Sequence, residues 1–361
     1  MPPAPPSPVP EDGELDDLDD AVFPKSGALA GAEAAGPHRL VGSPGRLDSV
    51  LSAALPLTRS RLAALIKAGA VRVDGAVVCR PSATLRGGED LAVEVPPPPP
   101  SALVPEDLGL PLLHLDAQVV VVHKPAALVV HPAKGHPTGT LVHGLLHLCA
   151  AAVPTPGDFP VDPSRPGVVH RLDRGTSGVM VAARTPEALA ALGAQFAAHT
   201  VERRYLALVH GRCPEDRGRV DLPLGRHPHD RLRIAVRAEG KRAVTHWERL
   251  AEGHFAVPGD KAGGVVSLVR CRLETGRTHQ IRVHLTELGL PLVGDPLYGR
   301  PARPLPRALA EGIDHQQLHA ARLGFSHPAS GARLRFFSPP EPPFLALCAA
   351  LGIDPACWAD T

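Results

Sequence analysis

The sequence predicts an α+β protein whose main domain is a mixed, largely antiparallel sheet with helices packed on it. Strand-like runs outnumber helical patterns, and some follow one another with no helix between them, as at 243–250 and 265–273. This succession favours antiparallel pairing over a parallel βαβ array. Hydrophobic residues make up 44% and charged residues 21% of the 361 positions, enough for a large core. Because aromatic residues are only 3%, this core is expected to consist of Leu, Val, Ile and Ala.

The main domain is expected to span residues 111–356. Thr185 followed by Pro186 predicts a capped helix start, and a second helical pattern covers 280–288. Alternation and β-branched residues predict the strands. They are expected at 119–123, 178–183, 205–209, 243–250, 265–273 and 333–337.

Residues 45–96 are expected to form a small α/β domain. Thr58 is a candidate N-cap for a helix that ends before Gly69. Two short β-prone runs then flank Asp74 and Gly75, the residue pair typical of a tight hairpin turn. The run VPPPPP ends this domain as a stiff spacer, so residues 97–110 are predicted to be a Pro-rich linker.

The net charge of +1 hides an uneven distribution. Residues 1–24 carry seven acids and no Lys or Arg, so the rest of the chain has a net charge of +8. Between Arg59 and Arg86 lie six basic residues against one acid, including Arg61 and Lys67 on the predicted helix. A second basic region, at 201–249, has twelve basic residues against seven acids. Such patches indicate a polyanionic partner, although each one is also typical of an ordinary solvated face.

Residues 1–44 are rich in Pro, Gly, Ala and acid, which predicts a disordered tail. Two interpretations stay open: the tail screens the basic patches, or it is only a solvated extension. The first residues have neither the basic start nor the apolar core of a secretory signal. No apolar run reaches the ~18 residues of a membrane span. The sequence therefore predicts a soluble cytoplasmic protein.

Sequence motifs that would bind a cofactor are absent. The chain has no G-x-x-x-x-G-K-[ST] for nucleotide phosphates, no G-x-G-x-x-G for a dinucleotide and no H-E-x-x-H for zinc. His143 and His147 are four apart on a probable helix but lack further ligands nearby, which favours packing or surface positions over a metal site. The six cysteines form no C-x-x-C pair and are expected to be reduced, mostly buried thiols. We expect neither a cofactor nor a metal.

The most distinctive segment is HRLDRGTSG at 170–178. It places Asp173 between Arg171 and Arg174, with two glycines and two hydroxyl residues directly after them. The glycines let the backbone approach another group closely. The arginines favour the ionised carboxylate that a nucleophile or base needs. The residues alone also allow a plainer interpretation, a surface Arg–Asp pair in a loop.

A second polar cluster, TGRTHQIRVH at 275–284, stands between an apolar strand and an apolar helix start. Arg277 at this junction is placed to bind a carboxylate or a phosphate with two hydrogen bonds. Tyr205 directly follows Arg203 and Arg204, so its ring is placed to stack on a base while the arginines bind phosphate. A strand tyrosine with its hydroxyl at the surface is the plainer alternative.

These segments resemble the RluA-type pseudouridine synthase family, in particular its RluD-like members. HRLDRGTSGVMVAART at 170–185 resembles the family signature, and Arg203-Arg204-Tyr205 resembles its tyrosine motif, in which Lys often stands where this chain has Arg. Further segments match in the same order: HKPAALVVHPAKGHPTGTLVHGLLHLC, GKRAVTHWERL, LETGRTHQIRVHL, PLVGDPLYG and LHAARLGFSHP. Residues 45–96 resemble the S-four type RNA-binding domain that often precedes this catalytic domain.

The resemblance implies an enzyme that isomerises uridine in RNA to pseudouridine. By resemblance Asp173 is the catalytic residue, which either attacks the anomeric ribose carbon or removes the neighbouring ribose proton. Tyr205 is then expected to stack on the uracil, Arg277 to keep Asp173 ionised, and the target nucleotide to flip out of its helix or loop. The other residues implied to contact RNA are Arg171, Arg174, Thr176 and His279, with Arg59, Arg61 and Lys67 in the S-four-like domain.

Large-subunit ribosomal RNA is the expected substrate, because the S-four-like domain resembles that of enzymes acting there; transfer RNA is the alternative. A non-catalytic RNA-binding factor for ribosome assembly is disfavoured by the intact Asp173, Tyr205 and Arg277. An aspartate-nucleophile hydrolase is disfavoured because no second carboxylate stands at suitable spacing near Asp173. The expected partner is RNA, free or within an assembling ribosomal subunit, and the protein is expected to be a monomer.

Overall fold

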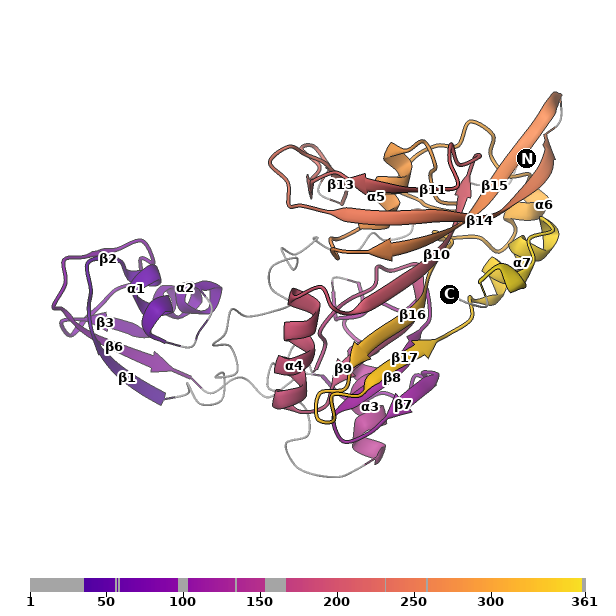
Figure 1. Cartoon of the computed structure of the whole chain (residues 1–361). Helices are drawn as coiled ribbons and strands as arrows, with labels where there is room; N and C mark the ends of the chain where they lie inside the picture. Colours follow the sequence, from indigo (N-terminus) through magenta and orange to yellow (C-terminus); the bar gives the residue numbers. More distant parts are fainter. Residues whose placement is uncertain are drawn as a thin grey trace, which may run out of the picture.

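The computed structural model describes residues 36–55, 57, 59–96, 103–133, 135–152, 167–230, 232–257 and 259–358. The described residues form two units, each with its own sheet and its own hydrophobic core (Figure 1). We call residues 36–96 the N-terminal domain and the described residues from 103 onward the main domain.

The N-terminal domain packs two helices on a small antiparallel sheet with the strand order β1-β6-β3-β4. Leu51 of the first helix and Ile66 of the second share a buried core with Leu91 of the sheet. Asp74 and Gly75 have φ angles of 51° and 80°, which confirms the predicted tight hairpin. The elements are β1 (Gly36–Val41), β2 (Gly45–Arg46), α1 (Leu47–Ala54), α2 (Arg59–Lys67), β3 (Val71–Val73), β4 (Ala76–Val77), β5 (Thr84–Leu85) and β6 (Asp90–Val95).

The sheet of the N-terminal domain extends beyond the boundary predicted at residue 45, because β1 lies before it. This strand pairs with β6 along its whole length, from Gly36 opposite Val95 to Val41 opposite Asp90. Its sequence, GPHRLV, contains a glycine and a proline and few apolar residues, so it lacks the usual strand signal. The rest of the predicted tail, residues 1–35, and the predicted cap Thr58 lie outside the described residues.

The main domain is built on a long sheet with the strand order β11-β14-β15-β10-β16-β9-β8-β7, and β17 also pairs with β16 (Figure 1). β16 and β9 run parallel, whereas the other neighbours are antiparallel, which confirms the predicted fold class. The strands are β7 (Leu112–Leu115), β8 (Val119–Lys124), β9 (Thr176–Ala183), β10 (Glu202–His210), β11 (Arg217–Asp221), β12 (Leu224–Arg226), β13 (Ile234–Val236), β14 (Val244–Val257), β15 (Asp260–Leu273), β16 (Leu318–Ser326) and β17 (Arg333–Phe337). The helices are α3 (Leu141–Ala152), α4 (Pro186–Ala197), α5 (Gln280–Glu287), α6 (Arg307–Ala310), α7 (Pro342–Ala350) and the 3-10 helix η1 (Pro355–Trp358).

The two faces of β10 belong to different cores. Tyr205 and Ala207 pack with residues of β8, β9 and α3, whereas Leu206 and Leu208 pack with α7. Successive side chains of a strand point to opposite faces, so the core that contains Tyr205 lies on one face and α7 covers part of the other. The residues of β10 that line the site described below, Arg203 and Tyr205, therefore lie on the same face of the strand.

The predicted linker 97–110 is wrong over its second half. Residues 97–102 lie outside the described residues, but Leu110 is buried in the main core and Glu106 accepts a hydrogen bond from the backbone of Gly139. At the other end Trp358 is buried against α7, just past the predicted boundary at 356. The predicted start of α4 is confirmed, because Thr185 Oγ1 accepts the backbone N–H of Ala188 at 3.2 Å.

All six cysteines are free thiols. Of the six free cysteines, four are buried, one is exposed and one is half-buried. None of the helices within the described ranges is both long and apolar enough to cross a membrane. In the same part of the chain, no cluster of three or more His, Cys, Asp or Glu side chains is arranged to hold a metal ion.

Gly178 brings β9 unusually close to β16. Its φ is 125°, and an added Cβ would lie 2.3 Å from the carbonyl oxygen of Ala320. We expect Gly178→Ala to lower the free energy of unfolding by about 1–3 kcal/mol, because the strands must separate. Denaturant unfolding of this variant and of Gly331→Ala checks this, since Gly331 also has a positive φ but no atom within 4 Å of an added Cβ. Equal losses in the two variants would contradict a contribution from the contact with β16.

Candidate active site

A pocket of about 290 Å³ opens on the main domain where the loop before β9, the end of α4, β10 and the segment 276–282 meet. Asp173, Tyr205 and Arg277, which are far apart in the sequence, all line it. Its volume is near the lower end for small-molecule sites, which start at about 300 Å³. The geometry therefore gathers the two polar clusters of the sequence around one small cavity.

Asp173 is held in a tight turn directly before β9. Its carbonyl oxygen accepts the backbone N–H of Thr176 at 3.1 Å, and Gly175 turns the chain with a φ of 80°. An added Cβ at Gly175 would lie 2.6 Å from the amide oxygen of Gln316. The Gln316 amide donates to the carbonyl of Arg174 at 2.6 Å and to Thr176 Oγ1 at 3.1 Å. The turn is thus fixed from both its backbone and its side chains.

Arg282 of α5 is the arginine that contacts Asp173. Its Nη1 lies 3.5 Å from Asp173 Oδ2, while Nε and Nη2 bind Asp295 at 2.8 and 2.9 Å. The side chain of Asp295 is fully buried and also accepts the backbone N–H groups of Leu297 and Tyr298. The planar guanidinium is therefore anchored by one carboxylate and presented to the other.

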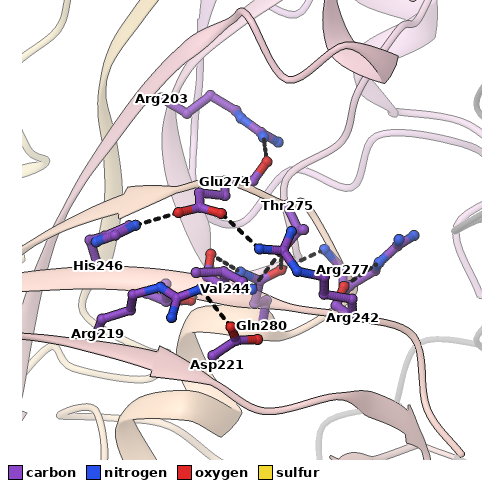
Figure 2. Close-up of polar contacts among 11 residues, drawn as sticks. Arg203, Arg219, Asp221, Arg242, Val244, His246, Glu274, Thr275, Arg277 and Gln280 are labelled. Carbon is purple, nitrogen blue, oxygen red and sulfur yellow. Dashed lines mark hydrogen bonds and ion pairs between the residues drawn. The ribbon is translucent and has the colours of Figure 1, made fainter.

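The prediction that Arg277 is the ionic partner of Asp173 is wrong. Arg277 is half-buried at the pocket, and its Nε donates to the carbonyl oxygen of Arg242 at 3.3 Å (Figure 2). The chain turns sharply at His279, which has a left-handed φ of 54°, before α5 begins. Because of this turn, the position that reaches Asp173 is Arg282 in the first turns of α5.

The surroundings keep Asp173 ionised. Burial raises the pKa of this carboxyl, but the charges of His279, Arg282 and Arg171 together lower it below the ordinary value. Burial lowers the pKa of His279 itself to about 4, so this imidazole is neutral at pH 7. At neutral pH the cations that stabilise the carboxylate are therefore Arg282 and Arg171.

Tyr298 fixes the orientation of His279. The backbone N–H of Ile234 donates to the Tyr298 hydroxyl at 2.8 Å, and that hydroxyl lies 2.6 Å from His279 Nδ1. With the hydroxyl hydrogen donated to Nδ1, the neutral imidazole carries its proton on Nε2. The guanidinium of Arg282 lies over the Tyr298 ring at 5.0 Å. One buried tyrosine thus supports two of the groups around Asp173.

Tyr205 lies on β10 with only 8% of its surface exposed and lines the pocket. Burial raises the pKa of its phenol, and the nearby Arg203 only partly opposes this. The phenol is therefore protonated at neutral pH and offers a flat ring and a hydroxyl. Arg203 is itself buried, lies over the Phe196 ring at 5.8 Å and donates to the carbonyl oxygen of Glu274 (Figure 2).

The other predicted site residues divide into two groups. Arg171, Thr176 and His279 line the pocket, whereas Arg174 does not, and its backbone carbonyl instead holds Gln316. In the N-terminal domain Arg61 and Lys67 lie on α2, with Lys67 exposed and Arg61 half-buried. The side chain of Arg59 lies outside the described residues.

Comparison with known proteins identifies the family. Residues 118–287 match the family model described as RNA pseudouridylate synthase, and residues 45–91 match the S4 domain. A Xanthomonas campestris protein named ribosomal large subunit pseudouridine synthase D is 45% identical over 325 residues, 87% of this chain and 91% of that protein. The chain belongs to the RluA-type RNA pseudouridine synthases. It is therefore an isomerase that converts uridine in RNA to pseudouridine.

One further relative agrees with this assignment, and one solved structure shows the same fold. A Zymomonas mobilis protein of the same name as the Xanthomonas protein is 42% identical over 297 residues, 81% of this chain and 89% of that protein. Human RNA Pseudouridylate Synthase Domain Containing 4 shares the fold of the synthase, with a TM-score of 0.50 at 23% identity. That alignment covers 67% of this chain and 93% of the human chain.

Four residues of the synthase pocket and its support were missed by the sequence reasoning. Arg282 stands in the polar cluster at 275–284, but the sequence-based prediction assigns its role to Arg277 of the same cluster. Asp295 and Tyr298 belong to PLVGDPLYG, whose resemblance to the family was noted without assigning a role to either. Gln316 carried no signal at all, because its role depends on a turn almost 150 residues earlier.

Proposed function

We propose that this synthase isomerises uridines in large-subunit ribosomal RNA, with Asp173 as its catalytic residue. The observation that carries the proposal is the ionised, largely buried Asp173 beside an anchored Arg282 in a pocket of small-ligand size. The names of the Xanthomonas and Zymomonas relatives support the choice of RNA, and so does the S4 domain.

The reaction exchanges one bond for another without an external reagent. The bond from uracil N1 to ribose C1′ breaks, and C5 of the turned uracil bonds to the same C1′. The proton on C5 is lost to solvent, and N1 gains a proton. Asp173 serves as a carboxylate in either course, attack on C1′ or removal of the neighbouring ribose proton, so both need the lowered pKa that Arg282 and Arg171 support.

Tyr205 and His279 are proposed to bind the uracil. The ring of Tyr205 lies in the pocket wall and stacks on the flipped base. The neutral His279, with its proton on Nε2, donates a hydrogen bond and adds no charge that would draw Asp173 away from its substrate. Neither group is a strong base at pH 7. The removal of the proton from C5 of the uracil is therefore assigned to Asp173 or to water.

Tritium release from RNA labelled at C5 of uridine tests the proposal. We expect release from unmodified large-subunit ribosomal RNA and much less from transfer RNA in a parallel reaction. Preferential release from transfer RNA would overturn the proposed substrate but keep the isomerase. Binding without release from either RNA would contradict the activity on free RNA and point to an assembling ribosomal subunit.

We further propose that the synthase acts as a cytoplasmic monomer. The main domain of one chain itself supplies Asp173, Tyr205 and Arg282 to the pocket. Sedimentation of the active enzyme with and without RNA checks this. A dimer that retains activity only when intact would contradict it.

The N-terminal domain is proposed to add RNA affinity through phosphate contacts. We expect removal of residues 1–96, which takes out the whole domain including β1, to weaken RNA binding and to flatten its dependence on salt. Each lost phosphate contact lowers the slope of log K against log salt by about 0.7–0.9. Filter binding over a salt series measures the slope. A slope unchanged by the deletion would show that this domain does not bind RNA through phosphate contacts.

A further inference from the structure

A line of basic side chains crosses the main sheet from strand to strand. Arg219 of β11 lies opposite His246 of β14, and His246 lies opposite Arg272 of β15. Arg272 lies opposite Arg204 of β10, which in turn lies opposite Arg322 of β16. Directly opposed residues of antiparallel strands share one face of the sheet. We call Arg219, His246, Arg272, Arg204 and Arg322 the cationic row, after its four arginines.

The cationic row lies on the face opposite the Asp173 pocket. Tyr205, Cys271 and Trp247 each neighbour a member of the row in the sequence, and all three are buried in the core on the pocket side. Side chains alternate between the two faces of a strand, so the row faces the other way. Further along β10 that other face is covered by α7, which packs on Leu206 and Leu208.

The row is open to solvent. Arg219 and Arg272 are exposed, and Arg204, His246 and Arg322 are half-buried. A shallow hollow lies over this part of the sheet. The arginines and the histidine that line it are Arg204, Arg217, Arg219, His246, Arg270 and Arg272.

The charges of the row are only partly balanced within the protein. Arg219 pairs with Asp221, His246 with Glu274 and Arg204 with Glu202, whereas Arg272 makes no ion pair among the described residues. Of these pairs only Arg219–Asp221 joins two exposed side chains. Such an exposed pair contributes only about 0–1 kcal/mol, so a phosphate can replace its acid. Like charges directly opposite on neighbouring strands are destabilising. Arg204 has an arginine opposite it on each side, an arrangement that a bound polyanion relieves.

An exposed aromatic ring continues the row at one end. Phe337 of β17 lies opposite Arg322 and has 41% of its surface exposed. Exposed rings beside arginines are typical of surfaces that bind single-stranded nucleic acid, because bases stack on the ring while the arginines bind phosphate.

Polar contacts link the row to the pocket around the start of β14 and the end of β15. Glu274 Oε1 lies 2.6 Å from His246 Nε2, and Glu274 Oε2 accepts a hydrogen bond from Arg242 at 3.1 Å (Figure 2). The carbonyl of Arg242 accepts from Arg277, which lines the pocket. Arg277 and the exposed Arg242 thus place positive charge between the Asp173 pocket and the row.

We propose that the cationic row is a second RNA-binding surface of the synthase. RNA that flanks the target uridine leaves the pocket past Arg277 and Arg242, crosses the start of β14 and the end of β15, and binds the row through its phosphates. Phe337 then stacks on one base of this flanking strand. The inference rests on the proposed function, because it places the RNA around a uridine held at Asp173.

The test compares the double variant Arg219→Gln/Arg272→Gln with the control Arg212→Gln/Arg307→Gln in the full chain. All four arginines are exposed, and the control pair lies outside both the row and the pocket lining. The probes are a large-subunit ribosomal RNA transcript and a short hairpin around a uridine that the wild type modifies. For the transcript, we expect the row variant to lower the salt slope by about 1.4–1.8, two phosphate contacts, and the control to keep the wild-type slope. For the hairpin, we expect one slope for all three proteins.

Two results would overturn the inference. One is a wild-type salt slope for the row variant on the transcript. The other is an equal fall of the salt slope in both double variants, which would indicate a general field of positive charge.

Phe337→Ala gives an independent check. Lost stacking should weaken binding of the transcript without changing the salt slope, and unaltered binding would exclude Phe337 from the surface. If the wild type releases no tritium, this result overturns the proposed function and not the RNA-binding surface. Failure of the proposed function and failure of this inference can therefore be distinguished.

Discussion

Asp173→Asn is expected to abolish pseudouridine formation while RNA binding stays close to that of the wild type. The amide has the shape of the carboxylate but is neither a nucleophile nor a base at this position, and such groups contribute about 10²–10⁴-fold. Arg282 stays in place in the variant, because Asp295 holds it with two hydrogen bonds. The pocket and the RNA surface should therefore keep their structure.

Tritium release and filter binding at one salt concentration measure the two effects of Asp173→Asn separately. Asp314→Asn is the matched control, because it removes the same charge from a carboxylate that is 86% exposed and outside the pocket. Retention of more than a few per cent of wild-type turnover would contradict the assignment of Asp173 as the catalytic residue. Loss of binding together with turnover would indicate a disturbed fold, which thermal unfolding of the variant would detect.

Local signals in the sequence were sufficient for several elements of the fold. Thr185 and Pro186 mark the start of α4, and Asp74-Gly75 marks the hairpin, because both signals act over a few residues. β1 carries no such signal, since its pairing with β6 more than fifty residues later makes it a strand. The packing of Leu110 onto the main core, which shortens the expected linker, is likewise a contact between distant segments.

The residue types of the candidate site could be predicted from the sequence, but the arginine that pairs with Asp173 could not. Asp173 and Tyr205 were singled out, and the structure brings both to one pocket. Arg277 and Arg282 stand five residues apart in the same polar cluster, so composition cannot tell which one reaches Asp173. The choice depends on the left-handed conformation of His279 and on the buried Asp295. A single sequence contains neither of these directly.

Arg282→Gln is expected to move the acid limb of the pH–rate profile to higher pH. In the wild type the pKa of Asp173 lies below its ordinary value, so the carboxylate is lost only as the pH falls through that low pKa. Without Arg282 the effect of burial is less opposed, and loss of an adjacent opposite charge raises a carboxyl pKa by about one to three pH units. Activity should then fall at mildly acidic pH, where the wild type is unaffected.

Single-turnover rates over a pH series check the shift and also decide between the two arginines. Arg282→Gln leaves the fully buried Asp295 without its cation, which costs about 3–5 kcal/mol of stability. The double variant Arg282→Gln/Asp295→Asn removes that buried charge and should show the same shifted limb in a more stable protein. Arg277→Gln should keep the wild-type limb, because the carbonyl of Arg242, not Asp173, accepts its Nε hydrogen bond. A limb that moves in Arg277→Gln and stays in both Arg282 variants would restore Arg277 as the ionic partner of Asp173.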